Sequence, residues 1–138
     1  MASPTVYVDV LGYPHVCRRC SVQQDWVWAV QARAIPRDGF REAFATDQEY
    51  PVQIARDLLI AAGHPDRAAL LGQRRERGRS FNPNICGSCR HQEDWYSFEG
   101  VLTAGYHEVR RAIASATCPV ARWRELVDLA RDNGAHWV

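Results

Sequence analysis

The start of the chain alternates between apolar and polar positions. Over residues 5–11, three valines fall on one side of an extended segment, and Tyr7 and Asp9 fall on the other. This period of two predicts a half-buried strand, which the Gly-Tyr-Pro triplet at 12–14 is expected to end. A second strand is predicted over 25–31, because its apolar side chains recur on one face. These side chains are Trp26, Trp28 and Val30.

The middle of the chain changes to a helical pattern. Pro51 suits the first turn of a helix predicted over 52–62, and Gly63 is suited to end that helix. A second, short helix is predicted over 65–71. Residues 40–50 fit either a helical turn or a loop.

The last third of the chain is predicted to be mostly helical. A short strand is expected over the aromatic segment 95–99, followed by helices over 106–116 and 119–133. The second of these helices carries an apolar stripe at helical spacing. The stripe consists of Val120, Trp123, Val127 and Ala130.

Four of the five cysteines form two CxxC pairs, separated by the 65 residues from 21 to 85. A tight turn between two thiols directs both sulfurs toward one cation, and two such turns supply the four ligands of a tetrahedral zinc site. Two independent redox dithiols are the alternative, but neither pair is followed by the helix that a thioredoxin-like motif requires. The predicted zinc ligands are Cys17, Cys20, Cys86 and Cys89. His15 and His91 lie two residues from a pair and are competing ligands only if a thiol is not used.

Composition favours a single globular domain in a reducing compartment. The chain has 138 residues, of which 46% are hydrophobic and 24% charged, as in ordinary globular proteins. The odd cysteine count, together with the absence of a signal peptide and of a long apolar run, predicts a cytoplasmic protein.

The formal charge of +1 opposes wholesale wrapping of nucleic acid but leaves room for a local basic patch. All seventeen basic side chains are arginines, whose planar guanidinium suits phosphate or carboxylate. The candidate nucleic-acid contacts are Arg18 and Arg19 in the first pair and Arg74, Arg75, Arg77 and Arg79 ahead of the second. The alternative for the latter run is a solvated loop or edge strand, partly neutralised by Glu76.

Two stretches resemble a group of uncharacterised bacterial proteins in which a long insertion splits a zinc ribbon. They are VDVLGYPH ahead of the first CxxC and NICGSC around the second. The similarity covers about 8–31 and 80–99; it implies a four-cysteine ribbon and supplies no catalytic residue. Many ribbon knuckles place glycine directly after the second cysteine, whereas this chain has Ser21 and Arg90 there.

Enzymatic readings have weaker support. Cys118 precedes Pro119 at a predicted helix start, where it is either an activated thiol or a buried or capping residue. No HExxH, GxSxG, P-loop or dinucleotide motif occurs. A metal-dependent nuclease, thiol chemistry at Cys118 and a redox-sensitive zinc switch remain the alternatives. Trp137 near the end of the chain is a candidate partner contact.

The predicted fold is α+β, with one domain over 1–138. A zinc ribbon of antiparallel strands is expected from 5–31 and 79–99, with an inserted helical hairpin at 51–72 and C-terminal helices at 105–133. The predicted function is a small zinc-binding, non-enzymatic module that contacts nucleic acid or a protein partner. Neither a membrane nor a small-molecule substrate is indicated.

Overall fold

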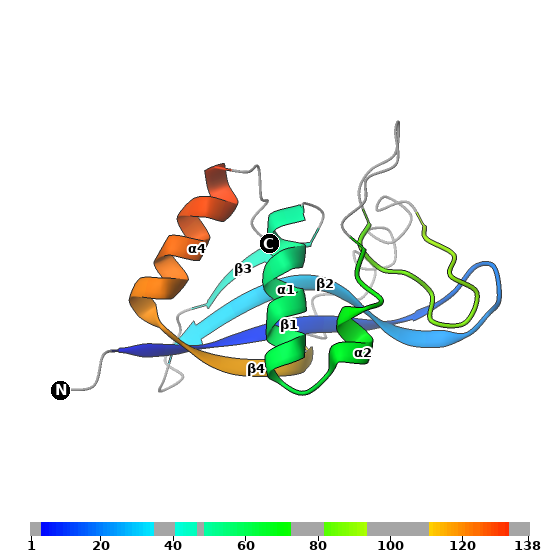
Figure 1. Cartoon of the computed structure of the whole chain (residues 1–138), viewed down its shortest axis with the longest axis horizontal. Coiled ribbons are helices and arrows are strands. Elements are labelled where there is room, and N and C mark those ends of the chain that lie inside the picture. The colour runs from blue at the N-terminus through cyan, green and yellow to red at the C-terminus, as the bar shows by residue number, and fades with distance from the viewer. Residues whose placement is uncertain (1–3, 35–40, 47–48, 73–81, 94–110, 133–138) are drawn as a thin grey trace.

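The computed structural model describes residues 4–34, 41–46, 49–72, 82–93 and 111–132. Four strands form one antiparallel sheet in the order β3-β2-β1-β4 (Figure 1). The strands are β1 (Thr5–Val16), β2 (Gln23–Ala34), β3 (Arg41–Ala45) and β4 (Arg111–Pro119). The helices are α1 (Glu49–Ala61), α2 (Pro65–Ala68) and α4 (Val120–Asp132). The α+β prediction is confirmed. Within the described ranges, no helix has both the length and the apolar character needed to cross a bilayer.

The centre of the sheet is a long hairpin made by β1 and β2. The two strands pair from Val6 opposite Ala34 to Val16 opposite Gln23, so the turn between them is the segment that carries the first CxxC. The expectation that residues 12–14 end the first strand is wrong. The strand continues through them to Val16, because a β-bulge absorbs the irregularity beside Gly12.

The bulge also changes which side chains share a face of β2. Gly12 pairs with Val27 and Leu11 with Ala29, so Trp28 is the extra residue. Val30 therefore lies in the core cluster under the helices, while Trp26 and Trp28 lie in a second cluster with Leu11. The prediction that Trp26, Trp28 and Val30 share one face is wrong, because an inserted residue shifts the alternation by one.

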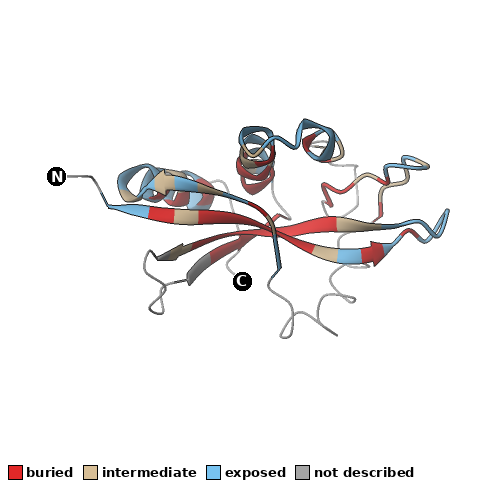
Figure 2. Cartoon of the chain, turned by 90° about the horizontal axis from the view of Figure 1, so that it is seen from below, coloured by how far each residue is buried: buried red, intermediate tan, exposed pale blue. Residues whose placement is uncertain are grey.

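The helices cover one face of the sheet (Figure 2). The three valines of the first predicted strand are buried there, as the alternation predicted. They pack in one cluster with Val52 and Leu59 of α1 and with Trp123 and Val127 of α4. The apolar stripe of the last helix is thereby confirmed. Hydrophobic burial on this face holds the helices across the strands.

The described helices follow the predictions with shifted ends. α1 covers all of the predicted segment except residue 62 and includes Pro51 in its first turn. Gly63 adopts a φ of 84° just beyond α1, and the His64 N–H donates to the Leu59 carbonyl at 2.8 Å, which closes the helix end. α2 is shorter than the predicted 65–71.

Two predictions for irregular or helical segments are wrong. The helix expected over 106–116 is replaced, in its described part, by β4, which pairs with β1 from Thr5 to Gly12. Alanine and arginine favour helix, but intrinsic propensity is small compared with tertiary interactions, and pairing with the long strand β1 overrides it. Part of 40–50, expected to be a helical turn or loop, is β3. The strand predicted over 95–99 lies outside the described residues.

Asp9 joins three strands on the face away from the helices. It is only 2% exposed, although the alternation of β1 placed it on the more polar side. Its Oδ2 accepts from Arg33 Nε at 2.8 Å, and its Oδ1 accepts from Ser115 Oγ at 2.6 Å. The Arg33 guanidinium lies over the Tyr7 ring at 4.5 Å. Two donors to one buried carboxylate account for its burial.

Candidate metal centre

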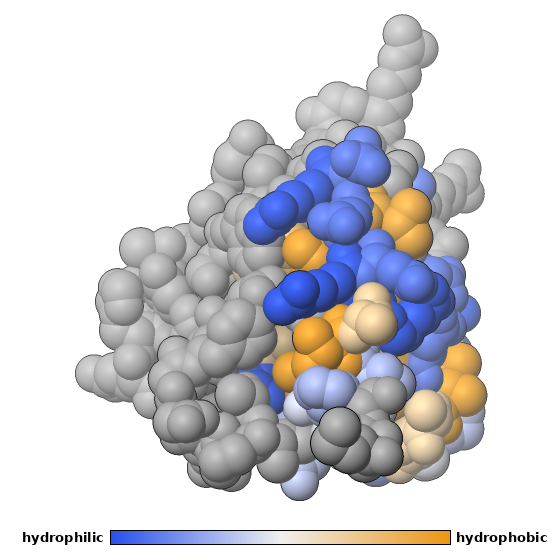
Figure 3. Space-filling model, turned by 90° about the vertical axis from the view of Figure 1, so that its left-hand side faces the viewer, coloured by the Kyte–Doolittle hydropathy of each residue, from blue (hydrophilic) through white to orange (hydrophobic). Residues whose placement is uncertain are grey.

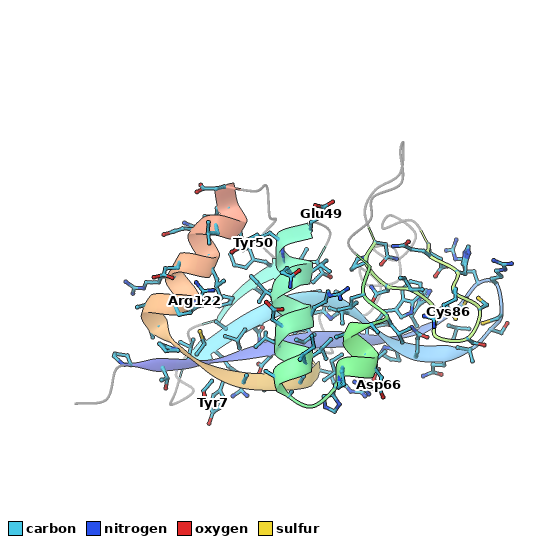
Figure 4. All side chains as sticks on the ribbon, viewed as in Figure 1. Tyr7, Glu49, Tyr50, Asp66, Cys86 and Arg122 are labelled. Carbon is cyan, nitrogen blue, oxygen red and sulfur yellow. The ribbon has the colours of Figure 1, made fainter. Side chains whose placement is uncertain are left out.

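The four CxxC cysteines meet at the tip of the β1–β2 hairpin. Figure 4 shows their sulfur atoms gathered beside Cys86, where the first turn and the 82–93 segment lie against each other. The four Sγ atoms all lie within 4.8 Å of one another. Cys17 Sγ is 3.7 Å from Cys89 Sγ, and Cys20 Sγ is 3.5 Å from Cys86 Sγ. The two turns therefore interlock, each contributing one sulfur to each close pair.

These separations match the donor geometry of a tetrahedral thiolate site. With a metal–sulfur distance of about 2.3 Å, the sulfurs of a regular tetrahedron lie about 3.8 Å apart. Among the described residues, the clustered ligand atoms are all cysteine sulfurs. The donor set thus suits a metal ion that prefers soft ligands and needs no further protein group.

The two CxxC turns have the same backbone hydrogen bonds. In the first, the Ser21 N–H donates to the Cys17 carbonyl and the Cys17 N–H donates to the Val22 carbonyl, both at 2.9 Å. In the second, the Arg90 N–H donates to the Cys86 carbonyl and the Cys86 N–H to the His91 carbonyl, again both at 2.9 Å. Two copies of one knuckle therefore face each other across the sulfurs.

Each knuckle turns through a residue with left-handed backbone. Ser21 has a φ of 63° and Arg90 a φ of 65°. These are the two positions after the second cysteine, where the sequence lacks the glycine common in ribbon knuckles. A side chain in this region costs about 1–2 kcal/mol. The knuckle geometry is therefore retained at both sites despite backbone strain.

Backbone N–H groups of the second knuckle point at its sulfurs. Those of Cys89 and Ser88 lower the pKa of the Cys86 thiol to about 6, against the opposing effect of burial. The His91 N–H lowers the pKa of Cys89, but burial and the three neighbouring thiols outweigh it and raise that pKa to about 11. Four thiols this close cannot all ionise without a cation among them.

Side-chain amides tie the second knuckle to β2. Gln24 donates from Nε2 to the Ile85 carbonyl at 3.1 Å and accepts from the Gly87 N–H at 2.9 Å. Asn84, which is 2% exposed, accepts from the Val27 N–H at 2.7 Å and donates to the Val27 carbonyl at 2.8 Å. Each of these two amide side chains both donates to and accepts from backbone groups of another segment, as a neighbouring strand would.

Asn82 organises the loop that leads into the second knuckle. Its Oδ1 accepts from the backbone N–H and the Nδ2 of Asn84 at 3.0 and 2.9 Å. Its carbonyl accepts from Gln92 Nε2 on the far side of the knuckle. The loop is therefore closed on itself as well as bound to β2.

A buried contact between a histidine ring and a carboxylate joins the two knuckles. His15 Nε2 lies 2.6 Å from Glu93 Oε2, and the side chains are 5% and 4% exposed. The His15 ring packs against Trp26 with centroids 4.1 Å apart, and Arg18 Nε lies 3.2 Å from Glu93 Oε1. His15 Nε2 is thus directed to a carboxylate and not to the sulfurs.

The arginines of the knuckles are exposed at this end of the molecule. Arg18 and Arg19 lie on the first turn and Arg90 on the second. Arg18 is drawn toward Glu93, whereas Arg19 and Arg90 have no ion-pair partner among the described residues. The predicted contacts Arg74, Arg75, Arg77 and Arg79 lie outside the described residues, as does Trp137.

Cys118 lies opposite the start of β1, whereas the four clustered sulfurs lie beyond the other end of that strand. It is the penultimate residue of β4, where it pairs with Val6, and its Sγ lies 3.4 Å from the Pro119 carbonyl. Burial raises the pKa of this thiol, although Arg122 opposes the shift. The direction is opposite to that of an activated nucleophile.

Sequence patterns did not reveal the residues that join the two knuckles. Gln24 and Glu93 lie in polar stretches without a recognisable motif, and Asn84 lies two residues ahead of the second CxxC pair. The usable signal was the concentration of amides and acids around the CxxC pairs. Their partners lie 57–78 positions away, beyond the reach of any local pattern.

A scan against models of protein families, a search of curated proteins and a search of solved structures each found no match to this chain. The fold and the cysteine geometry therefore define its class. It is an α+β protein in which four thiols from two distant turns form a set that can hold a metal ion.

Proposed function

We propose that this protein binds one zinc ion through Cys17, Cys20, Cys86 and Cys89, and that the ion is structural. The single observation that carries the proposal is the convergence of four sulfurs within 4.8 Å. Four cysteine ligands fill a tetrahedral shell and leave no position for substrate. When bound, zinc supplies charge neutralisation of the thiolates and a cross-link between the knuckles.

The knuckle residues support this role without the metal. Their N–H groups point at sulfur, and Gln24 and Asn84 hold the second turn against β2. A structural ion of this kind contributes about 10 kcal/mol to folding, which is comparable to the whole net stability of a small domain. A reduced, cytoplasmic environment is the expected setting for such thiols.

Metal content tests the zinc proposal. Native mass spectrometry should find one zinc in the wild type and in Cys118→Ser, and none in Cys17→Ser or Cys86→Ser. The matched control separates loss of a ligand from loss of any thiol. A wild type that takes up no zinc on refolding with the metal, or a Cys17→Ser variant that retains it, would contradict the proposal.

We infer further that the zinc-bound end is an interaction surface and not a catalytic site, with nucleic acid as its partner. Support comes from Arg19 and Arg90, which are exposed on the two knuckles beside the sulfurs. Arginine forks bind phosphate well. The raised pKa of Cys118 leaves the thiol-enzyme alternative without support.

Fluorescence anisotropy with DNA and RNA oligonucleotides over a salt series tests this inference. Arg19→Ala/Arg90→Ala should weaken binding and reduce the salt slope by about 1.8 if both residues contact phosphates of duplex DNA. The matched control is Arg122→Ala/Arg124→Ala, which removes the same charge from α4 at the opposite end of the molecule. Figure 3 shows that end, where hydrophilic side chains alternate with small apolar patches.

If both double variants lose the same affinity for the oligonucleotide, binding depends on the overall positive charge of the protein. That result would contradict a phosphate site at the knuckles. No binding by zinc-loaded wild type would remove nucleic acid as the partner and favour a protein one. Neither result affects the zinc proposal, because metal content is measured separately.

A further inference from the structure

β4 is an edge of the sheet in the described part of the chain. The order β3-β2-β1-β4 gives it one neighbour, β1. Figure 2 looks at the molecule from the β4 side and shows this strand crossing in front of the others, with no described element before it. Among the described strands, none pairs with its outward N–H and C=O groups, which are the groups through which another strand would join the sheet.

The middle of β4 lacks the usual protections of an edge strand, since its charge and its proline lie at its two ends, Arg111 and Pro119. Natural edges carry charges, prolines or strong irregularity that block pairing. Residues 112–118 have the sequence AIASATC, without charge or proline. The one irregularity is a bulge at Ile113, near the start of the strand. Arg111 is compensated by Asp25 at 3.0 Å, so the edge has no uncompensated charge to repel a copy of itself.

We propose that β4 pairs antiparallel with β4 of a second copy of this chain, about a two-fold axis at Ala116. Such an axis lies perpendicular to the sheet and joins the two sheets into one of eight strands. The regular part of the strand, beyond the bulge, runs from Ala114 to Pro119. Ala116 is the centre of its segment 114–118.

The register about Ala116 matches side chains of the same kind. Ala114 and Cys118 point to the helix side, because they pair with Val10 and Val6 of the core, and the axis sets them opposite each other. Ser115 and Thr117 point to the other side and also become cross-strand partners, a favourable hydroxyl pair. The two Arg111 residues stand ten positions apart along the joined strands, about 34 Å at 3.4 Å per residue.

The helix side supplies a second contact. The last turn of α1 reaches over β4 (Figure 1), and Ile60 in that turn is 53% exposed. The two-fold axis places both α1 ends on the same face of the joined sheet, flanking the axis. An edge contact of this length buries less than the ~800 Å² per partner of a standard interface. The dimer is therefore expected to be weak and dependent on concentration.

Analytical ultracentrifugation of the zinc-loaded full chain, from low micromolar to near-millimolar concentration, tests the proposal. Ala116→Pro and Thr117→Pro are made as a pair, because successive N–H groups point alternately to β1 and outward. Proline at the residue whose N–H points outward leaves the hydrogen bonds between β4 and β1 intact, so that variant should keep the wild-type melting temperature. It should raise the dimer dissociation constant by about tenfold or more.

Thr117→Lys gives a test that does not depend on backbone change. It should also weaken the dimer, whereas Ala69→Lys adds the same charge on an exposed residue of the α2 end and should not. A wild type that stays monomeric at the highest concentration would overturn the proposal. So would a dimer unaffected by Thr117→Lys. A monomer that captures extended peptides at β4 would assign the edge to another partner and equally overturn it.

Discussion

The left-handed residues of the knuckles allow a prediction whose sign is unusual. Ser21→Gly and Arg90→Gly should each stabilise the protein, although most substitutions destabilise. The backbone at these positions has φ values of 63° and 65°, where a Cβ is strained. The backbone N–H groups of both residues donate to the carbonyl of the first cysteine of their pair, Cys17 or Cys86, at 2.9 Å. These bonds use backbone atoms and survive the change.

The expected gain follows from two opposing terms. Removing the Cβ relieves about 1–2 kcal/mol of left-handed strain, while glycine adds about 0.5–1 kcal/mol of unfolded-state entropy. The net gain is about 0.5–1 kcal/mol for each site and about 1–2 kcal/mol for both. For a domain of this size, 1 kcal/mol raises the melting temperature by roughly 4 °C.

Urea unfolding with saturating zinc measures the gain, because metal content is then equal in all variants. Ser88→Gly is the matched control, since Ser88 lies in the same knuckle without a positive φ. It should destabilise by about 0.5–1 kcal/mol. Arg90→Ala separates the loss of charge from the relief of strain. If Ser21→Gly and Arg90→Gly lower the unfolding free energy as Ser88→Gly does, the strain argument is refuted.

Three further predictions concern the body of the protein. Asn84→Ala should cost about 3–5 kcal/mol in urea unfolding, because it removes three hydrogen bonds and leaves the Val27 N–H buried without its acceptor; a cost below 1 kcal/mol would show that the bridge is dispensable. Gly12→Ala should cost about 1–3 kcal/mol, because the added Cβ would lie 2.6 Å from Ile113 Cγ2, and Ile113→Ala should restore part of that loss in the double variant. Cys118 should react slowly with iodoacetamide at neutral pH and faster above its usual pKa of 9.0, because burial raises that pKa; since the thiol ionises more readily in the unfolded chain, its contribution to stability is kept below pH 9 and lost above it. Fast labelling at pH 7 that disappears in Cys118→Ser would contradict this direction.

Local sequence patterns were sufficient wherever the determining interactions are local. The CxxC spacing defines a turn, so the four cysteines that cluster in the structure could be named without knowing the fold. The alternation of the valines in β1 and the helical spacing of Trp123 and Val127 in α4 likewise reflect one face of one element. Gly63 ends α1 for the same kind of reason, since its φ of 84° is a backbone requirement of the turn itself.

Interactions across the chain decided the rest. Residues 111–116 have helical preference, yet they form β4 because β1 offers a long row of backbone partners. The bulge at Trp28 cannot be inferred from alternation, since one inserted residue reverses the face of all that follow.

The sequence by itself predicted that four thiols in two turns form a set that can hold one metal ion, because that chemistry depends on residue type and short spacing. Only the tertiary structure decided how the turns meet. His15 contacts Glu93, 78 positions away in the sequence, and Asn84 bonds to Val27, 57 positions away. A buried polar group needs a hydrogen-bond partner, and the fold determines which partner lies within reach.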